Sequence, residues 1–236
     1  MGAKSIAIIT ARGGSKRIPH KNIKEFCGRP IIEYSIEAAI KAKIFDTVMV
    51  STDDEQIAEI AKGAGAEVPF MRSEKTANDY ATTADVLREV IEEYEKRGEM
   101  FVYGCCIYPT APFITEEKLQ KAMYELKEDV RDCVMPVAAF SFPPLRGMVF
   151  CERKLEYKWP EYMLARSQDL EEIYHDCGQF YAFNVKKFLD SGKIVTNNTG
   201  GIIVSELEMQ DIDNETDWKL AELKYKLWKE EKDELI

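Results

Sequence analysis

Short strand-like runs alternate with amphipathic helical stretches through the first 140 residues, and this alternation limits the fold more than any other feature. Apolar, β-branched runs at 5–10, 47–51 and 101–108 are separated by helical patterns at 31–43, 82–97 and 115–127. Strands that alternate with helices in this way form a parallel sheet with helices on both faces. We therefore predict a doubly wound, mostly parallel α/β sheet that binds its ligands at the carboxyl ends of the strands.

The alternation stops between residues 141 and 176, where prolines, aromatic residues and charges mix without any period. We interpret this segment as a small inserted arm, which divides the α/β domain into 1–140 and 177–236. Strand character returns at 179–184 and 201–205, and apolar residues at helical spacing predict a last helix at 215–229.

Composition places the chain among ordinary globular proteins, because 45% of its 236 residues are hydrophobic and 31% are charged. No apolar run approaches the roughly 18 to 20 residues that span a bilayer, and the amino terminus leads directly into a strand pattern rather than a signal peptide. We expect a cytoplasmic protein without membrane contacts. The six cysteines form no Cys-x-x-Cys pair, which argues against a zinc site.

Charge is distributed unevenly along the chain. The net charge of −10 argues against a nucleic-acid partner, which needs a broad basic face. Residues 1–24 nevertheless contain six cations and no acidic residue, and the other 212 residues carry −16. A short basic segment on an acidic protein suits a small polyanion.

The basic segment contains a glycine loop directly after the first strand, reading ARGGSKRIPHKN from Ala11 to Asn22. Two glycines let backbone amides approach phosphate oxygens, and arginine and lysine add positive charge. The loop is neither a Walker A motif nor a dinucleotide fingerprint. A solvated basic loop is the alternative, but the preceding strand and the lack of acidic residues favour a triphosphate site.

A second motif, Gln210-Asp211-Ile212-Asp213, alternates two carboxylates. On an extended segment both would face the same side, where their hard oxygens could hold Mg²⁺ with water and phosphate completing its shell. Such a pair also occurs in solvated turns and at helix starts. The triphosphate loop favours the metal site.

The run from Ile8 to Asn22 closely resembles the signature of the sialic-acid-type CMP-sugar synthetases. The resemblance spans nearly the entire chain, because it also includes the Asp211/Asp213 pair and residues 166–181. It implies a Rossmann-like nucleotidyltransferase that transfers CMP from CTP to the anomeric hydroxyl of a nine-carbon 2-keto sugar acid. Arg12, Lys21 and Asp211 would be catalytic, and Asp211 and Asp213 would bind Mg²⁺. The implied CTP-binding residues are Ala11, Arg12, Gly13, Gly14, Ser15, Lys16, Lys21, Asn22, Arg72 and Thr82, although Thr82 also suits a helix cap.

The resemblance extends to the sugar site. Arg166 could form a two-pronged pair with the sugar carboxylate, and Gln179 and Tyr181 could pair with hydroxyl groups. The alternative is an interface between subunits. Both roles can hold, because the arm of related synthetases dimerises and helps line the neighbour's active site, so we expect a homodimer.

Two exchanges distinguish this chain from the sialic acid enzymes. Tyr108 stands where they have glutamine, and Cys177 stands where they have asparagine. We expect both in the sugar pocket. The segment 166–181 resembles the branch of the family that acts on pseudaminic acid. The same reaction on sialic or legionaminic acid remains an alternative, as does a catalytically silent nucleotide-binding protein. The proton acceptor is open between Asp211, a metal-bound hydroxide and water.

Overall fold

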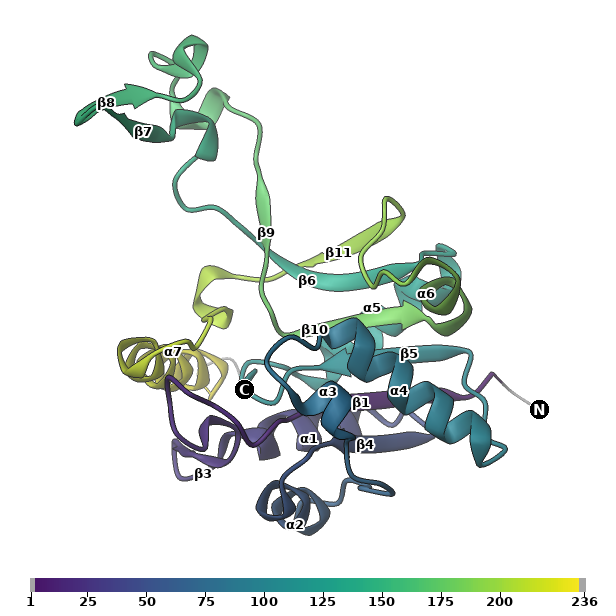
Figure 1. The fold of residues 1–236 in the computed structure, drawn as a ribbon. Helices are drawn as coiled ribbons and strands as arrows, with labels where there is room; N and C mark the ends of the chain where they lie inside the picture. The colour runs from purple at the N-terminus through teal and green to yellow at the C-terminus, as the bar shows by residue number, and fades with distance from the viewer. Residues whose placement is uncertain (1–2, 234–236) are drawn as a thin grey trace.

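A seven-stranded sheet forms the centre of the chain, which we describe over residues 3–233 of a computed structural model (Figure 1). Its strand order is β11-β6-β10-β5-β1-β4, and β9 also pairs with β6. Only β9 and β10 run antiparallel to the other five strands. The predicted α/β class and the mostly parallel sheet are confirmed. The strands are β1 (Ser5–Thr10), β4 (Thr47–Ser51), β5 (Tyr103–Ile107), β6 (Cys133–Ala139), β9 (Tyr174–Asp176), β10 (Phe180–Asn184) and β11 (Thr199–Ile203).

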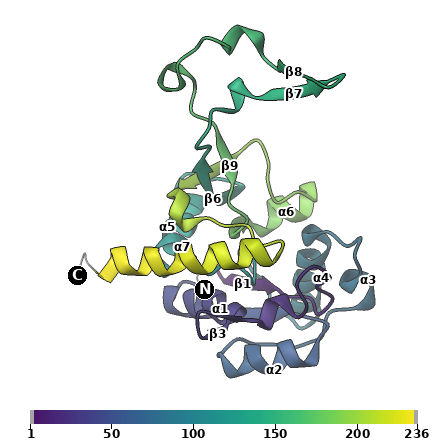
Figure 2. The same cartoon turned by 90° about the vertical axis from the view of Figure 1, so that its left-hand side faces the viewer.

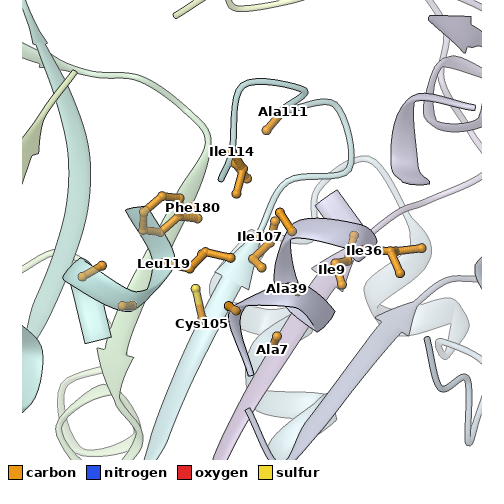
Figure 3. Packing of buried hydrophobic residues seen from close by; sticks show 14 of the residues in the cluster. Ala7, Ile9, Ile36, Ala39, Cys105, Ile107, Ala111, Ile114, Leu119 and Phe180 are labelled. Carbon is orange, nitrogen blue, oxygen red and sulfur yellow. The ribbon is translucent and has the colours of Figure 1, made fainter. Parts of the chain in front are cut away.

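Helices cover both faces of the sheet because its central strands are buried on both sides. In β1, Ala7 and Ile9 belong to one core, shown in Figure 3, while Ile6 and Ile8 belong to the core on the opposite face. The first core also takes residues of α1 (Ile31–Ala42), α2 (Glu55–Gly63) and α5 (Glu116–Glu128). The second takes residues of α4 (Thr83–Lys96) and α6 (Val185–Ser191). The short helix α3 (Glu74–Ala77) precedes α4.

A capping box, in which Thr82 is the helix cap, is present at the start of α4. The Thr82 side chain accepts a hydrogen bond from the Asp85 backbone amide, and the Asp85 carboxylate accepts one from the Thr82 amide. Two of the unpaired amides that begin every helix are thereby satisfied. Thr82 therefore has the structural role that the sequence left open, and it still faces the cavity described below.

The carboxyl-terminal helix α7 (Glu215–Asp233) packs over the start of the chain. Its Trp218, Tyr225 and Trp228 pack in one cluster with Phe26 of the small hairpin formed by β2 (Glu25–Phe26) and β3 (Arg29–Pro30). Burying such side chains contributes about 1.5 to 3 kcal/mol each. The segment before α7 is thereby held beside the glycine loop.

The segment between β6 and β9 extends away from the sheet in both views (Figures 1 and 2). It contains a two-stranded hairpin, β7 (Met148–Cys151) and β8 (Lys154–Tyr157), and three 3₁₀ turns. The chain rejoins the sheet at β9, three residues earlier than the boundary read from the sequence. In the described part of the chain the 3₁₀ turns are η1 (Lys21–Ile23), η2 (Pro144–Arg146), η3 (Pro160–Tyr162), η4 (Ser167–Asp169) and η5 (Glu206–Glu208). Within residues 3–233, every helix is too short or too polar to cross a bilayer.

Candidate active site

The glycine loop is held at its base by two acidic residues that follow β4. The Gly13 amide donates to Asp53 Oδ1 at 2.9 Å, and the Asp54 carboxylate caps α2 by accepting from the Ile57 amide at 3.0 Å. A side chain at Gly13 would place its Cβ only 2.6 Å from Asp54 Oδ2, so glycine is required there by close packing. Asn22 Nδ2 closes the loop by donating to the Arg12 carbonyl at 2.8 Å.

The segment from η5 to Asp213 is anchored to the sheet by a half-buried ion pair. Lys118 of α5 lies 2.7 Å from Glu208 Oε1, and Gln179 Nε2 donates to the Glu208 carbonyl at 2.6 Å. Near the other end of the segment, Lys21 Nζ donates to the Ile212 carbonyl at 2.7 Å, across 191 residues of sequence. These contacts bring the Asp-x-Asp motif to the glycine loop.

The two aspartates flank a buried residue, as an extended segment requires. Ile212 is only 1% exposed and packs in the cluster under α7, while Asp211 is exposed and Asp213 half-buried. Asp213 Oδ1 lies 2.7 Å from Arg17 Nη2. The alternation therefore buries Ile212 and leaves Asp211 and Asp213 outside the core.

A cavity of about 510 Å³ opens between the glycine loop, the segment 72–86 and the residues after β5. Five cations and two carboxylates are among its lining residues: Arg12, Lys16, Arg17, Lys21, Arg72, Asp79 and Asp213. Polar groups with no charge complete much of the remaining wall: Thr10, Ser15, Asn22, Thr76, Asn78, Thr82, Thr83, Tyr108 and Thr110. The excess of cations in a confined space suits a ligand with several negative charges.

Two of these cations are partly withdrawn from water. Arg72 is 8% exposed and its guanidinium donates to Ser51 Oγ at 3.1 Å and to the Ser51 carbonyl at 2.7 Å. Burial lowers the pKa of Arg72, and Asp53 opposes that shift. Burial likewise lowers the pKa of Lys21, while Asp213 and Asp211 oppose it. Partly desolvated cations gain more from an anionic ligand than fully hydrated ones.

Most of the residues predicted to bind CTP line this cavity: Arg12, Ser15, Lys16, Lys21, Asn22, Arg72 and Thr82. Ala11, Gly13 and Gly14 are not among its lining residues. Ala11 is fully buried and its amide donates to the Ser51 carbonyl at 3.0 Å, so it fixes the start of the loop. Sequence reasoning assigned no role to Arg17, although it lies in the same basic run.

The predicted sugar-binding residues separate into two layers. Tyr108 lines the cavity. Tyr181 lies behind it, with ring centroids 5.7 Å apart, and its hydroxyl donates to Asp176 Oδ2 at 2.5 Å. Gln179 is 3% exposed, and among residues 3–233 its Oε1 has no hydrogen-bond partner. Neither Gln179 nor Tyr181 is among the lining residues, so only Tyr108 forms the wall itself.

Cys177 corrects a sequence-based expectation. It is 4% exposed and packs in the core between the sheet and α5, not on the wall of the cavity. Burial raises the pKa of its thiol to about 12, so it is a neutral core residue.

Arg166 lies on the arm, away from the cavity of its own chain. Its side chain is 73% exposed and pairs with Asp169, three residues along, at 2.8 Å. It is not among the cavity residues.

The residues present fit Mg²⁺ only if water and the substrate phosphates supply the rest of its ligands. The described part of the chain holds no cluster of three or more histidine, cysteine, aspartate or glutamate side chains that could hold a metal. Asp213 supplies a hard oxygen donor at the cavity, whereas Asp211 is exposed and is not among the lining residues. This donor set suits Mg²⁺, which keeps waters and takes the rest of its ligands from phosphate.

Comparison with known proteins gives consistent matches. A family model described as cytidylyltransferase matches residues 6–191. Pseudaminic acid cytidylyltransferase of Campylobacter jejuni is 36% identical over 225 residues, which cover 95% of this chain and 97% of that enzyme. CMP-N,N'-diacetyllegionaminic acid synthase of Legionella pneumophila is 32% identical over 227 residues, covering 92% of this chain and 94% of that enzyme.

Solved structures give the same fold. CMP:2-keto-3-deoxy-manno-octonic acid synthetase in complex with CTP superposes with a TM-score of 0.67 at 17% identity, covering 97% of this chain and all of that one. At that identity the likeness concerns the fold alone. The family match and the identities above carry the assignment further: this chain belongs to the cytidylyltransferase family.

Proposed function

We propose that this protein transfers CMP from CTP to the anomeric hydroxyl of pseudaminic acid and releases pyrophosphate. The observation that carries the proposal is the cavity in which five cations of two distant segments meet the Asp213 carboxylate. The choice of sugar rests on the 36% identity to the Campylobacter jejuni enzyme over nearly the whole length of both chains. A reaction that consumes CTP belongs in the cytoplasm, where nucleoside triphosphates are made.

The cations would hold the triphosphate and stabilise the charge that develops during transfer. The sugar hydroxyl attacks the α-phosphorus in line, a new P–O bond forms, and the bond to the pyrophosphate oxygen breaks. Negative charge then grows on the phosphoryl oxygens and on the leaving group, where fixed positive charge is most effective. The assignment of this role to Arg12 and Lys21 is supported by their presence in the cavity lining and, for Lys21, by its hydrogen bond to the Ile212 carbonyl.

Bound Mg²⁺, held by Asp211 and Asp213, would neutralise phosphate charge. The protein would supply the remaining catalysis by positioning the two reactants, which removes much of the entropy barrier of a bimolecular step. Arg72, which is largely buried in the cavity wall and bonded to Ser51, would give that positioning a rigid cation.

A homodimer would complete the sugar site. All residues of β7 and β8 except Tyr157 are exposed, and Phe150 and Leu164 on the arm are 77% and 87% exposed. An isolated two-stranded hairpin is marginally stable in water, and clustered exposed apolar residues are typical of interfaces. A two-fold partner would cover the arm and could receive Arg166 at its own cavity.

The decisive experiment measures pyrophosphate release with CTP, Mg²⁺ and a panel of nine-carbon sugar acids, and identifies the product by mass. We expect CMP-pseudaminic acid as the preferred product. Preference for legionaminic acid would replace the sugar and keep the reaction; the 32% identity to the Legionella pneumophila enzyme makes this the second candidate. CTP binding without pyrophosphate release for any sugar would indicate a silent nucleotide-binding protein and refute the proposal.

A further inference from the structure

We infer that the Asp79 carboxylate is the counter-anion of the glycine loop in the absence of substrate. It pairs with Arg12 and Lys16 until the triphosphate displaces it. When pyrophosphate leaves, it competes again for these cations. The inference rests on the proposed function, because it assigns a role in the same cavity. It adds a residue that tunes substrate affinity and product release.

The carboxylate of Asp79 bridges two cations of the loop. Asp79 Oδ1 lies 2.7 Å from Arg12 Nη1, and Oδ2 lies 2.5 Å from Lys16 Nζ. All three residues line the cavity. A planar anion between a guanidinium and an ammonium makes the charge-assisted bonds that a phosphate group would make with the same donors. Asp79 therefore competes with an incoming phosphate for the same positive charge.

The backbone around Asp79 is fixed by contacts that do not involve its carboxylate. Asn78 Oδ1 accepts from the amides of Tyr80 at 2.8 Å and Ala81 at 3.0 Å. On the amino-terminal side, Glu89 of α4 accepts from the Ser73 amide at 2.8 Å. On the carboxyl-terminal side, the capping box holds the start of α4. The turn that carries Asp79 is thus positioned before any ligand arrives.

The carboxylate itself is free to rotate once its cations are engaged elsewhere. Within residues 3–233, the hydrogen bonds of this carboxylate are those with Arg12 and Lys16. The side chains of Asp79, Arg12 and Lys16 are 45%, 39% and 76% exposed. Ion pairs at this exposure are weak, so a ligand with several phosphate charges can replace the carboxylate at low cost.

Asp79 stays charged throughout the physiological range. Lys16, and then Arg12, hold the pKa of its carboxyl below the usual range. When displaced it remains on the same fixed turn, near the bound phosphates, and repels them. The same residue therefore lowers the affinity for CTP and favours the departure of pyrophosphate.

The test replaces Asp79 with its neutral isostere, Asp79→Asn, and measures binding of CTP and of pyrophosphate by titration calorimetry in the presence of Mg²⁺. We expect both ligands to bind about 3- to 30-fold more tightly, since two weak competing pairs and one repulsion are removed. Cytidine, which has no phosphate, should bind with unchanged affinity. The gain should shrink at high salt, because exposed charges are screened.

Glu74→Gln is the matched control. Glu74 lies five residues earlier on the same segment, is exposed and is absent from the cavity lining, so this variant changes the net charge equally. It should leave all three affinities unchanged. If Glu74→Gln tightens the binding of CTP and pyrophosphate equally, the effect comes from the net charge and the inference is overturned.

Unchanged or weaker binding of CTP and pyrophosphate by Asp79→Asn would also overturn the inference, since Asp79 would then orient the cations rather than compete for them. A wild-type protein that binds neither ligand would refute the proposed function and this inference together. Asp79→Ser, which also removes the charge, must tighten pyrophosphate binding in the same direction; failure there overturns the inference as well.

Discussion

Replacing Lys21 by alanine should abolish most of the transfer reaction while leaving the fold intact. The Lys21 ammonium joins the glycine loop to the Asp-x-Asp segment through the Ile212 carbonyl, at 2.7 Å, and lines the cavity. Removing one preorganised donor from a transition state costs about 2.7 to 4 kcal/mol, which corresponds to roughly 100- to 1,000-fold in turnover.

The cost to folding should be much smaller. The ammonium makes one hydrogen bond to a neutral carbonyl, and its partial burial opposes the charged form. The net loss is about 1 kcal/mol, because the hydrogen bond and the desolvation cost offset each other. Lys21→Met, which keeps the length of the side chain without its charge, should lose as much activity as Lys21→Ala.

The pH dependence of activity separates the catalytic role of the Lys21 charge from its contribution to stability. Burial lowers the pKa of Lys21, so the free enzyme should lose kcat/KM on the alkaline side at a lower pH than an ordinary lysine would give. A lysine whose pKa falls on folding binds fewer protons in the folded state, so its contribution to stability rises with pH. The loss of activity is therefore not unfolding, and Lys21→Arg should move the alkaline limb to higher pH.

The assay is pyrophosphate release at saturating CTP and sugar, with thermal unfolding followed by circular dichroism. Turnover of Lys21→Ala within about threefold of wild type would refute the assignment of this residue to the reacting phosphates. A large drop in its unfolding temperature would instead refute the claim that its role is catalytic rather than structural.

Three further outcomes are expected. Chelation should stop the reaction and Mg²⁺ should restore it, whereas Asp213→Asn should need more Mg²⁺ for half-maximal rate; activity that survives chelation contradicts the metal site. Light scattering at micromolar concentration should give a dimer for wild type and a monomer for the double variant Phe150→Glu/Leu164→Glu. A wild-type protein that is monomeric contradicts the predicted dimer. Tyr108→Gln should lower the preference for pseudaminic over sialic acid, measured as the ratio of kcat/KM values, by about 5- to 100-fold, since one hydrogen-bonding group in the wall changes; an unchanged ratio places the determinant elsewhere.

Local patterns in the sequence predicted most strands of the sheet and the helices α1, α4, α5 and α7, but not β9 or α6. The buried strands are apolar on both faces, so their runs are visible without knowledge of their neighbours. The start of α4 could be predicted because Thr82 and Asp85 satisfy each other's amides within four residues. The glycine loop could be located because it follows β1 directly and contains its own cations.

The composition of the site depended on contacts between distant parts of the chain. Lys21 meets Ile212 across 191 residues, and Arg72 reaches Ser51 of β4 across 21. No local pattern encodes such a meeting, because it is fixed by which helices pack together. The hydrophobic packing of α7 against the hairpin at Phe26 brings the Asp-x-Asp segment to the loop.

The direction of individual side chains was also decided only by the tertiary structure. In β10, Phe180 and Ala182 enter one core while Tyr181 and Phe183 enter the other, so alternation alone could not tell a wall residue from a buried one. Cys177 and Gln179, which precede this strand, are also buried, and alternation alone could not show this. The sequence by itself determined the sheet and the chemistry of the loop, because both depend on neighbours in the chain. Which carboxylates, cations and aromatic rings share one cavity was determined by packing across the whole fold.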